Sequence, residues 1–300
     1  MGHERHRIRR RRLALTFATI AVLLLALAAS ASADLITPES GGSRNADEID
    51  SLYKIILVLA FLVFFGVEGV LVYSLVKFRA RRGAVAAQIR GNTRLEIGWT
   101  IGASVILVVL AVVTFVKLNP IRNPPNSDAN GFQASASGVQ MASAFRPKPP
   151  NGKALNIKVN GQQYVWRYTY PDGDTNVLNN AFSYGELVVP TNTTVTLDIN
   201  AQDVAHSWWI PKLGGKFDAI PGYTNHTWFK IPKPAVYDGR CAELCGRGHA
   251  NMIATVRALP PAQFERWLAD KRAQLKQADT AAAQSRRQIQ RQQSGGNAAP

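Results

Sequence analysis

Cysteine is scarce in this chain, which holds only Cys241 and Cys245 among its 300 residues. Two cysteines exclude a framework of several disulfides, and the absence of a Cys-x-x-Cys-His motif excludes a covalently attached haem. The chain also has no phosphate-binding loop, no recognisable nucleophile motif and no internal repeat. Its chemistry must therefore come from a small number of special residues.

Acidic residues are outnumbered, with 20 Asp and Glu against 35 Lys and Arg, but the basic charge is unevenly distributed. Six arginines between residues 5 and 12 precede an apolar run at 13–29, which is followed by Ala31-Ser-Ala33. This layout is typical of a secretory signal peptide at 1–33, cleaved after Ala33. The alternative is an uncleaved first membrane helix. Either interpretation places Asp34 and the following residues outside the cytoplasm.

Two long stretches have almost no charge. Residues 55–76 are apolar except for Glu68, and residues 97–116 carry no charge at all. Each is long enough to cross a bilayer. The loop at 77–94 carries six basic residues and no acid, which indicates a cytoplasmic loop. Residues 34–119 are therefore predicted to be an external segment followed by a transmembrane hairpin. Membrane lipid, rather than nucleic acid, explains the basic charge.

Two carboxyl groups are associated with these spans. Glu68 lies within the first span, where a carboxyl is costly and is a functional candidate by default. Its alternative role is a hydrogen-bonded packing residue against a partner helix. Glu96 stands at the start of the second span, where the helix dipole alone favours an acid.

The remainder of the chain changes character twice. Residues 120–152 are rich in proline and are predicted to form an irregular, exposed linker. Short β-rich runs follow at 155–159, 164–170, 186–189, 193–199, 206–210, 227–231 and 252–258. Asn160-Gly161 and Asp172-Gly173 are hairpin signals. About seven short strands predict a β-sandwich or barrel at 153–260. A helix at 261–277 and a disordered tail at 278–300 are predicted to follow.

A cluster of soft donors lies near the end of the β-rich region. Cys241, Cys245, His249 and Met252 combine thiolate, imidazole and thioether, a set that suits copper. A mononuclear blue-copper site needs one cysteine, so the second thiolate indicates a pair of metals. His206, in an apolar strand-like run, is placed to complete the site. The alternatives are a Cys241–Cys245 disulfide, a zinc site that leaves Met252 unexplained, and a buried core histidine.

These residues resemble a known family, subunit II of haem–copper oxidases of the cytochrome c oxidase type. The resemblance rests on Cys241-x-Glu243-x-Cys245-x3-His249-x2-Met252, on Asp203-Val-x-His206-Ser and on Lys216-Phe-Asp218-x-x-Pro221-Gly222. It covers roughly residues 50–260. It implies a cupredoxin-like Greek-key β domain outside a bacterial plasma membrane.

The resemblance also assigns roles. It implies a binuclear copper centre, called CuA, in which Cys241 and Cys245 bridge two coppers, while His206 and His249 bind one each. Met252 and the backbone carbonyl of Glu243 would be weak outer ligands, and the Glu243 side chain would bind magnesium at the interface with the catalytic subunit. Glu96 would mark a proton-uptake channel. Cytochrome c would donate electrons to the centre, and the partner subunit would reduce oxygen to water while protons are pumped.

The sequence departs from the family pattern in two ways. The family's run Gly-His-Gln-Trp appears as Gly161-Gln-Gln-Tyr164, so Tyr164 stands where electrons usually enter, with Trp166 as its rival. Residues 120–270 also carry 14 Lys and Arg against 11 Asp and Glu, which puts docking of a basic cytochrome in doubt. The competing functions are a membrane-tethered copper-binding or copper-delivery protein and a structural subunit with an empty site.

Overall fold

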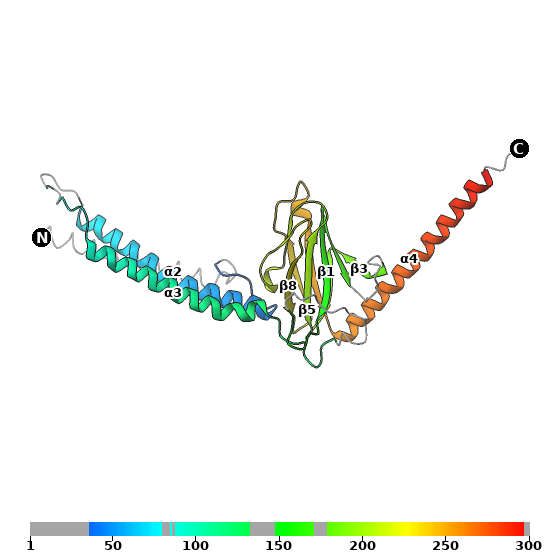
Figure 1. Cartoon of the computed structure of the whole chain (residues 1–300), viewed down its shortest axis with the longest axis horizontal. Coiled ribbons are helices and arrows are strands. Elements are labelled where there is room, and N and C mark those ends of the chain that lie inside the picture. The colour runs from blue at the N-terminus through cyan, green and yellow to red at the C-terminus, as the bar shows by residue number, and fades with distance from the viewer. Residues whose placement is uncertain (1–35, 80–84, 86–87, 133–147, 171–178, 297–300) are drawn as a thin grey trace, which may run out of the picture. The chain divides into compact units, whose positions relative to one another are not determined.

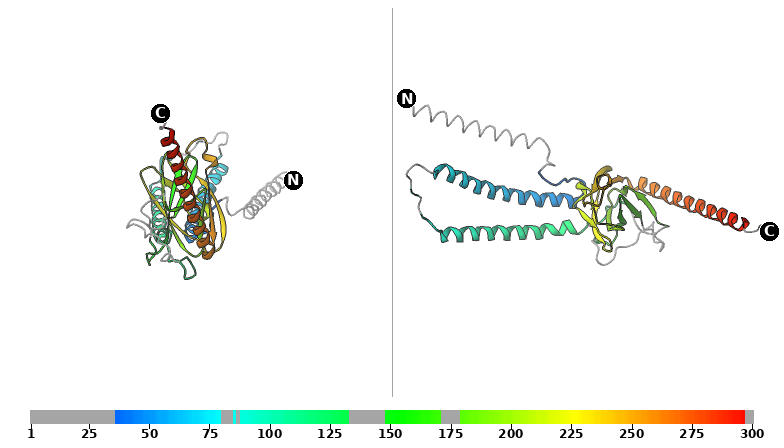
Figure 2. Two further views of the ribbon diagram at one scale, coloured as in Figure 1. Left: turned by 90° about the vertical axis from the view of Figure 1, so that its right-hand side faces the viewer. Right: turned by 90° about the horizontal axis from the view of Figure 1, so that it is seen from above.

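The computed structural model describes residues 36–79, 85, 88–132, 148–170 and 179–296. Within these ranges, two long helices come first, α2 (Arg44–Lys77) and α3 (Thr93–Arg122). Ten strands and two short 3-10 helices follow, and a third long helix, α4 (Pro261–Gly296), comes last (Figures 1 and 2). The predicted signal peptide at 1–33 and the Asp172-Gly173 hairpin signal lie outside the described residues.

The two apolar stretches are helical, as predicted. α2 and α3 pack side by side and are both long and apolar enough to span a membrane (Figure 1). Both helices extend beyond the predicted apolar spans because their polar ends also form helical turns. α3 begins at an N-cap, Asn92, whose side chain accepts a hydrogen bond from Leu95 N at 3.2 Å. An ion pair of 2.8 Å between Lys117 and Glu48 joins the N-terminal end of α2 to the C-terminal end of α3.

The β domain consists of two five-stranded sheets. The first has the order β3-β2-β1-β5-β8 and the second β4-β10-β9-β6-β7. The pairs β1–β5 and β10–β4 are parallel and all other pairs are antiparallel. Large apolar side chains from both sheets fill the space between them, among them Trp166, Leu187, Leu197 and Trp208. The prediction of an all-β sandwich after two apolar helices is confirmed.

The strand bounds are as follows: β1 (Leu155–Gln162), β2 (Val165–Tyr170), β3 (Ala181–Tyr184), β4 (Glu186–Pro190), β5 (Thr194–Ala201), β6 (His206–Trp209), β7 (Phe217–Ala219), β8 (Asn225–Lys230), β9 (Ala235–Cys241) and β10 (Ile253–Leu259). The 3-10 helices are η4 (Pro211–Leu213) and η5 (His249–Asn251). All seven predicted strands are present. β3, β7 and β9 were not predicted, because β3 and β7 are short and Asp238-Gly239 interrupts the β pattern of β9.

The prediction of a hairpin turn at Asn160-Gly161 is wrong. Both residues lie inside β1, where Gly161 pairs with Trp166, and the turn falls at Gln163 and Tyr164. The close approach of two rings explains the glycine better than a turn does. A Cβ at Gly161 would lie 3.0 Å from the Trp166 ring and 3.1 Å from the His206 ring.

Two boundary predictions also need correction. The linker was expected to be exposed from residue 120, but α3 continues to Arg122, and Phe132 is buried against Phe264 with ring centroids 5.3 Å apart. The disordered tail was expected from residue 278, but α4 is helical to Gly296. Residues 262–294 contain no glycine or proline and are rich in alanine, glutamine and arginine, which favour a helix without tertiary contacts.

Hydrogen bonds join the N-terminal end of α2 and the C-terminal end of α3 to the β domain. The buried Asn45 side chain donates to the carbonyl oxygens of Leu213 and Trp228, at 3.1 and 2.9 Å. Trp228 Nε1 donates to the Ile121 carbonyl at 2.9 Å. These bonds satisfy buried backbone groups that would otherwise be costly to leave unpaired.

Candidate metal centre

Three strands bring the candidate ligands to one end of the sandwich. His206 begins β6 and Cys241 ends β9, and the register of these strands pairs Trp208 with Cys241. The loop that follows Cys241 returns to the start of β10. Its two ends are joined by a hydrogen bond of 2.9 Å from Cys241 N to Met252 O. Residues 35 positions apart in the sequence therefore meet at a fixed place.

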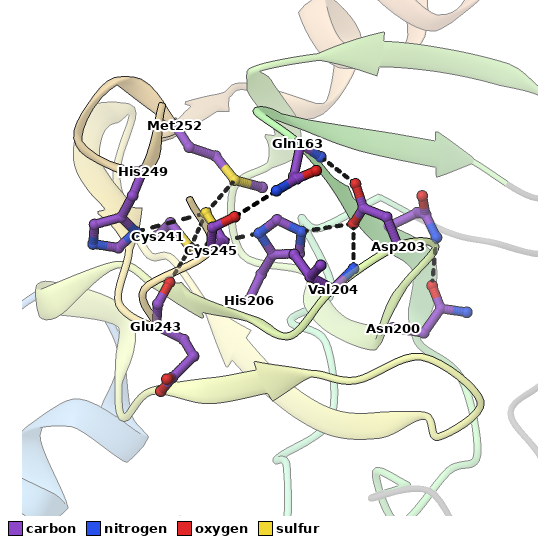
Figure 3. A network of polar contacts seen from close by, with 11 residues as sticks. Gln163, Asn200, Asp203, Val204, His206, Cys241, Glu243, Cys245, His249 and Met252 are labelled. Atoms are coloured by element: carbon purple, nitrogen blue, oxygen red, sulfur yellow. Dashed lines mark hydrogen bonds and ion pairs between the residues drawn. The ribbon is translucent and has the colours of Figure 1, made fainter. Parts of the chain in front are cut away.

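The donor atoms form a compact cluster (Figure 3). Cys241 Sγ lies 3.9 Å from Cys245 Sγ and 3.8 Å from His206 Nδ1. Cys245 Sγ lies 3.7 Å from His249 Nδ1 and 4.0 Å from Met252 Sδ. His206, both cysteines and Met252 are buried, whereas His249 is half-buried. The structure thus brings together the thiol, imidazole and thioether groups that the sequence singled out.

These spacings suit metal coordination. A first-row ion such as zinc holds a thiolate sulfur about 2.3 Å away, so two sulfurs on one tetrahedral ion lie roughly 3.8 Å apart. The Sγ–Sγ distance of 3.9 Å matches two thiolates on a common ion. It exceeds a disulfide bond length of about 2.0 Å by a wide margin, and both cysteines are free. The buried thioether favours copper over zinc.

Burial, and after it the neighbouring Cys241, raise the pKa of the Cys245 thiol to about 11. A metal binds the thiolate form, so an ion entering this site displaces the thiol proton. The free site therefore holds a buried thiol that is neutral at pH 7, which removes the repulsion that two adjacent thiolates would suffer without a cation.

His206 is oriented by a carboxylate. Its Nε2 lies 2.9 Å from Asp203 Oδ1, which leaves Nδ1 to face Cys241 Sγ. Burial on its own raises the pKa of Asp203, but hydrogen bonds from Gln163 N, His206 and Val204 N outweigh it and hold that pKa below its ordinary value. The carboxylate thus stays charged and holds the imidazole proton on Nε2. The lone pair of Nδ1 is then available to bind a metal.

The turn between β1 and β2 holds both Asp203 and the loop that carries Cys245. Gln163 N donates to Asp203 Oδ2 at 2.7 Å, and the Gln163 side chain donates to the Cys245 carbonyl at 2.6 Å. Figure 3 shows Gln163 between the two. Sequence reasoning assigned no role to Gln163 or Asp203. For Asp203 a signal existed, because it precedes His206 by three residues; for Gln163 there was none.

Tyr164 and Trp166 have different surroundings. The Tyr164 ring is 38% exposed and lies on the loop after Cys245. A Cβ at Gly246 would lie 2.6 Å from its hydroxyl, and one at Gly248 would lie 2.4 Å from its ring, so both positions require glycine. Trp166 is completely buried, with its ring centroid 5.9 Å from that of His206. One ring therefore faces solvent above the loop and the other supports His206 from the core.

Glu243 contributes only its backbone to the donor cluster, and Glu96 lies outside it. The carbonyl oxygen of Glu243 lies 3.3 Å from Cys241 Sγ, while its exposed carboxylate points away from the sulfurs (Figure 3). Glu96 is exposed in the first turn of α3. Its helix-start position is as predicted.

Two family models match the chain. "Cytochrome C oxidase subunit II, transmembrane domain" matches residues 30–116, and "Cytochrome C oxidase subunit II, periplasmic domain" matches residues 183–259. Cytochrome c oxidase subunit 2 of Alkalihalophilus pseudofirmus is 34% identical over 244 residues, which cover 80% of this chain and 63% of that protein. Probable cytochrome c oxidase subunit 2 of Rickettsia bellii is 31% identical over 240 residues, which cover 75% and 80%. This chain belongs to the cytochrome c oxidase subunit II family.

Among solved structures, the periplasmic domain of subunit II (CoxB) of Bradyrhizobium japonicum is 33% identical. The match covers 41% of this chain and 97% of that one, with a TM-score of 0.38. Family membership confirms the cupredoxin-like class expected for the β-sandwich. It also confirms a membrane-anchored chain with an extracytoplasmic domain, which agrees with two apolar helices preceding the β domain.

The Asp203–His206 contact leads to the first prediction. In Asp203→Asn, an amide replaces the carboxylate that orients the imidazole, and we expect metal affinity to fall about 10- to 100-fold. Competition with a chelator on the purified protein measures the change. Asp238→Asn, on the exposed part of β9, is the matched control and should retain the original affinity. Equal affinities for both variants would show that Asp203 does not orient the ligand.

Proposed function

We propose that this chain is the electron-accepting subunit of a proton-pumping terminal oxidase, and that its β domain holds a binuclear copper centre. The observation that carries the proposal is the buried pair of thiols 3.9 Å apart, with a ring nitrogen beside each. Cys241 and Cys245 would hold the coppers together with His206 and His249, and Met252 and the Glu243 carbonyl would complete the set. Copper bound there supplies one-electron transfer.

The protein contributes rigidity and exclusion of water. The ligands are fixed before any metal is present by three hydrogen bonds: from the Gln163 side chain to the Cys245 carbonyl, from His206 to Asp203, and from Cys241 N to Met252 O. Burial keeps water from the sulfurs. A site that cannot rearrange keeps the same ligand geometry in both redox states, so little reorganisation accompanies each electron.

Electrons would come from a cytochrome c that docks over the exposed end of the β domain. Tyr164 offers a planar ring at this surface, and Trp166, two residues further along the chain, is buried against His206. Leu244, between the two cysteines on the same loop, is 78% exposed and offers a further apolar side chain for docking. Because residues 120–270 carry a formal net charge of +3, a cytochrome with a neutral or acidic docking face is favoured.

The catalytic subunit, with its haems, would receive the electron and reduce oxygen to water. The Glu243 carboxylate, which points away from the sulfurs, is available to bind magnesium at the interface with that subunit. Magnesium prefers carboxylate and water oxygens over sulfur, which suits this side chain. Glu96, at the cytoplasmic start of α3, would admit protons into the catalytic subunit.

A membrane-tethered copper-delivery protein is the second candidate. The same thiol pair favours it, because a protein that passes copper on needs the same soft donors. The complete donor set and its bracing from three segments favour a resident ion over a transferred one, since a delivery site has to release its metal. Co-purification with a haem-containing membrane protein distinguishes the two.

The copper count tests the proposal. We expect the reduced protein to bind two coppers per chain and to share one unpaired electron between them, as measured by metal analysis and electron paramagnetic resonance. Cys245→Ser removes a bridging ligand and should abolish the shared-electron signal. Oxidation of the two thiols to a disulfide before copper is added should also prevent binding, and reduction should restore it. One copper per chain contradicts the binuclear centre.

The two aromatic rings make a second test. Tyr164→Ala should slow the arrival of electrons from reduced cytochrome c in rapid mixing, with copper content unchanged, because the ring lies at the surface above the centre. Tyr184→Ala is the matched control, since that tyrosine is 53% exposed on β3 and its ring contacts Phe182, which is not a candidate ligand. A slower rate in Trp166→Phe but not in Tyr164→Ala would place the electron path at the buried ring.

Glu96 is tested by turnover of the complete oxidase. Glu96→Ala should slow oxygen consumption and leave the copper signal unchanged, because the residue lies on the cytoplasmic side of the chain's membrane hairpin. Glu96→Asp keeps a carboxyl at the helix start and should restore much of the rate. Unaltered turnover in Glu96→Ala would show that Glu96 has no role in proton uptake and serves only as an acid at the helix start.

A further inference from the structure

The outer face of the first sheet carries a polar hollow that the proposed electron transfer does not use. Its volume is about 410 Å³, within the range of pockets that hold small ligands. Its lining side chains come from β1, β2 and β5 and from the segment between β7 and β8, and every one of them is polar. None of them is a candidate copper ligand.

The strand register places six of these side chains in two rows. Across β2, β1 and β5, the rows read Thr169, Lys158, Asp198 and Arg167, Asn160, Asn200. Residues two apart on a strand share a face, so the two rows lie next to each other. Thr169 and Asp198 are buried, whereas Lys158 is exposed. Short side chains thus form the floor of the hollow, and a basic side chain stands at its rim.

Two cations in the hollow have no counter-ion. Among the described residues neither Lys158 nor Arg167 forms an ion pair, and the buried Nε of Arg167 has no hydrogen-bond acceptor. The guanidinium carbon of Arg167 lies 4.6 Å from the centroid of the Phe182 ring, which supports the group without neutralising it. Lys158 and Arg167 are diagonal neighbours on adjacent strands, so both can reach one ligand. A guanidinium group presents a planar fork of donors that matches a carboxylate or a phosphate.

The acidic residue in the hollow is already engaged. Asp198 Oδ1 lies 2.9 Å from His226 Nδ1, and Asp198 Oδ2 accepts a hydrogen bond of 3.3 Å from the Asn156 side chain. Both oxygens therefore have partners within the sheet, and the two cations remain for a ligand. One carboxylate held in this way also makes a poor site for calcium or magnesium, since these ions take several oxygen ligands.

The remaining lining suits hydroxyl groups. Asn160 Nδ2 donates to Asn200 Oδ1 at 2.9 Å, which leaves Asn160 Oδ1 as an acceptor and Asn200 Nδ2 as a donor. The Gln202 amide and the hydroxyl groups of Thr169 and Thr224 add further donors and acceptors. A hydroxyl group both donates and accepts, so neighbouring amides can bind several hydroxyl groups of one ligand.

We propose that this hollow binds a small polyhydroxylated anion, of the class of sugar phosphates and sugar acids. Lys158 and Arg167 bind the anionic group, and the amides of Asn160, Asn200 and Gln202 bind the hydroxyl groups. An apolar ligand finds no apolar side chain in this lining, and inorganic phosphate leaves the amides unused. The site does not depend on the proposed function, so its failure would leave the copper centre untouched.

The test measures ligand binding to the purified full-length chain by calorimetry. The protein is loaded with copper and kept in a detergent without a sugar head group, and the probes are glucose 6-phosphate, glucuronate, glucose and inorganic phosphate. We expect glucose 6-phosphate or glucuronate to bind about tenfold more tightly than both glucose and inorganic phosphate, because only these two carry an anionic group together with hydroxyl groups. The tighter of the two identifies the anionic group. If neither binds more tightly than glucose, or neither more tightly than inorganic phosphate, the inference is overturned.

Substitutions in the lining test each part of the recognition. Lys158→Gln and Arg167→Gln each remove one cation and should lower the affinity for the tighter probe about 10- to 150-fold, the range of a hydrogen bond to a charged group. Asn200→Ala should lower the affinity for that probe and leave the weaker binding of inorganic phosphate unchanged, because the amide contacts hydroxyl groups. Unchanged affinity in both cation variants would overturn the site, and unchanged affinity in Asn200→Ala would overturn the recognition of hydroxyl groups.

Lys233→Gln is the matched control. Lys233 is exposed between β8 and β9, outside the lining, and its replacement changes the net charge by the same amount as Lys158→Gln. It should retain the original affinity, and the copper signal of the β domain shows that each variant is folded. An equal loss of affinity in Lys233→Gln and Lys158→Gln would assign the binding to net charge alone and overturn the inference.

Discussion

The two sulfur atoms of Cys241 and Cys245 lie 3.9 Å apart in a buried position, and this proximity constrains everything around them. Two thiolates at that distance repel each other, so the pair holds at least one neutral thiol unless a cation lies between the sulfurs. The raised pKa of Cys245 agrees with the first state. Nearby carbonyl oxygens and ring nitrogens offer the second state a complete set of donors. The loop therefore holds the two sulfur atoms at a separation that suits a shared metal ion.

The β-sandwich supplies what the loop cannot supply for itself. A loop of twelve residues has no core of its own, so its shape depends on where its ends are held. Cys241 ends β9 and Met252 precedes β10, and the hydrogen bond between their backbones continues the pairing of these two strands. The turn between β1 and β2 belongs to the other sheet and holds the loop through Gln163. Contacts from both sheets therefore fix the same short segment.

The strands that could be predicted from the sequence are those with an uninterrupted β pattern, such as β5 and β10. Short strands and β9, with its Asp238-Gly239 step, depend on pairing with distant neighbours and give no local signal. The donor set was visible because copper chemistry restricts the residue types. The positions of Asp203 and Gln163 were not, because a carboxylate or an amide at the surface has many uses. Only the folded chain brings them to His206 and Cys245.

The two halves of the described chain face opposite problems of solvation. In the β domain, the polar groups nearest the sulfurs find partners within the chain: His206 contacts Asp203, and Gln163 contacts Cys245. In the hairpin, the Glu68 carboxyl has no donor among the described residues, and the most apolar stretches of both helices are not buried by the rest of the chain. Water can solvate an unpaired group on the first domain but not one inside a bilayer. The β domain therefore supplies the hydrogen-bond partners around its candidate copper ligands from within the chain. The described part of the membrane hairpin supplies neither a donor for Glu68 nor cover for its apolar surface.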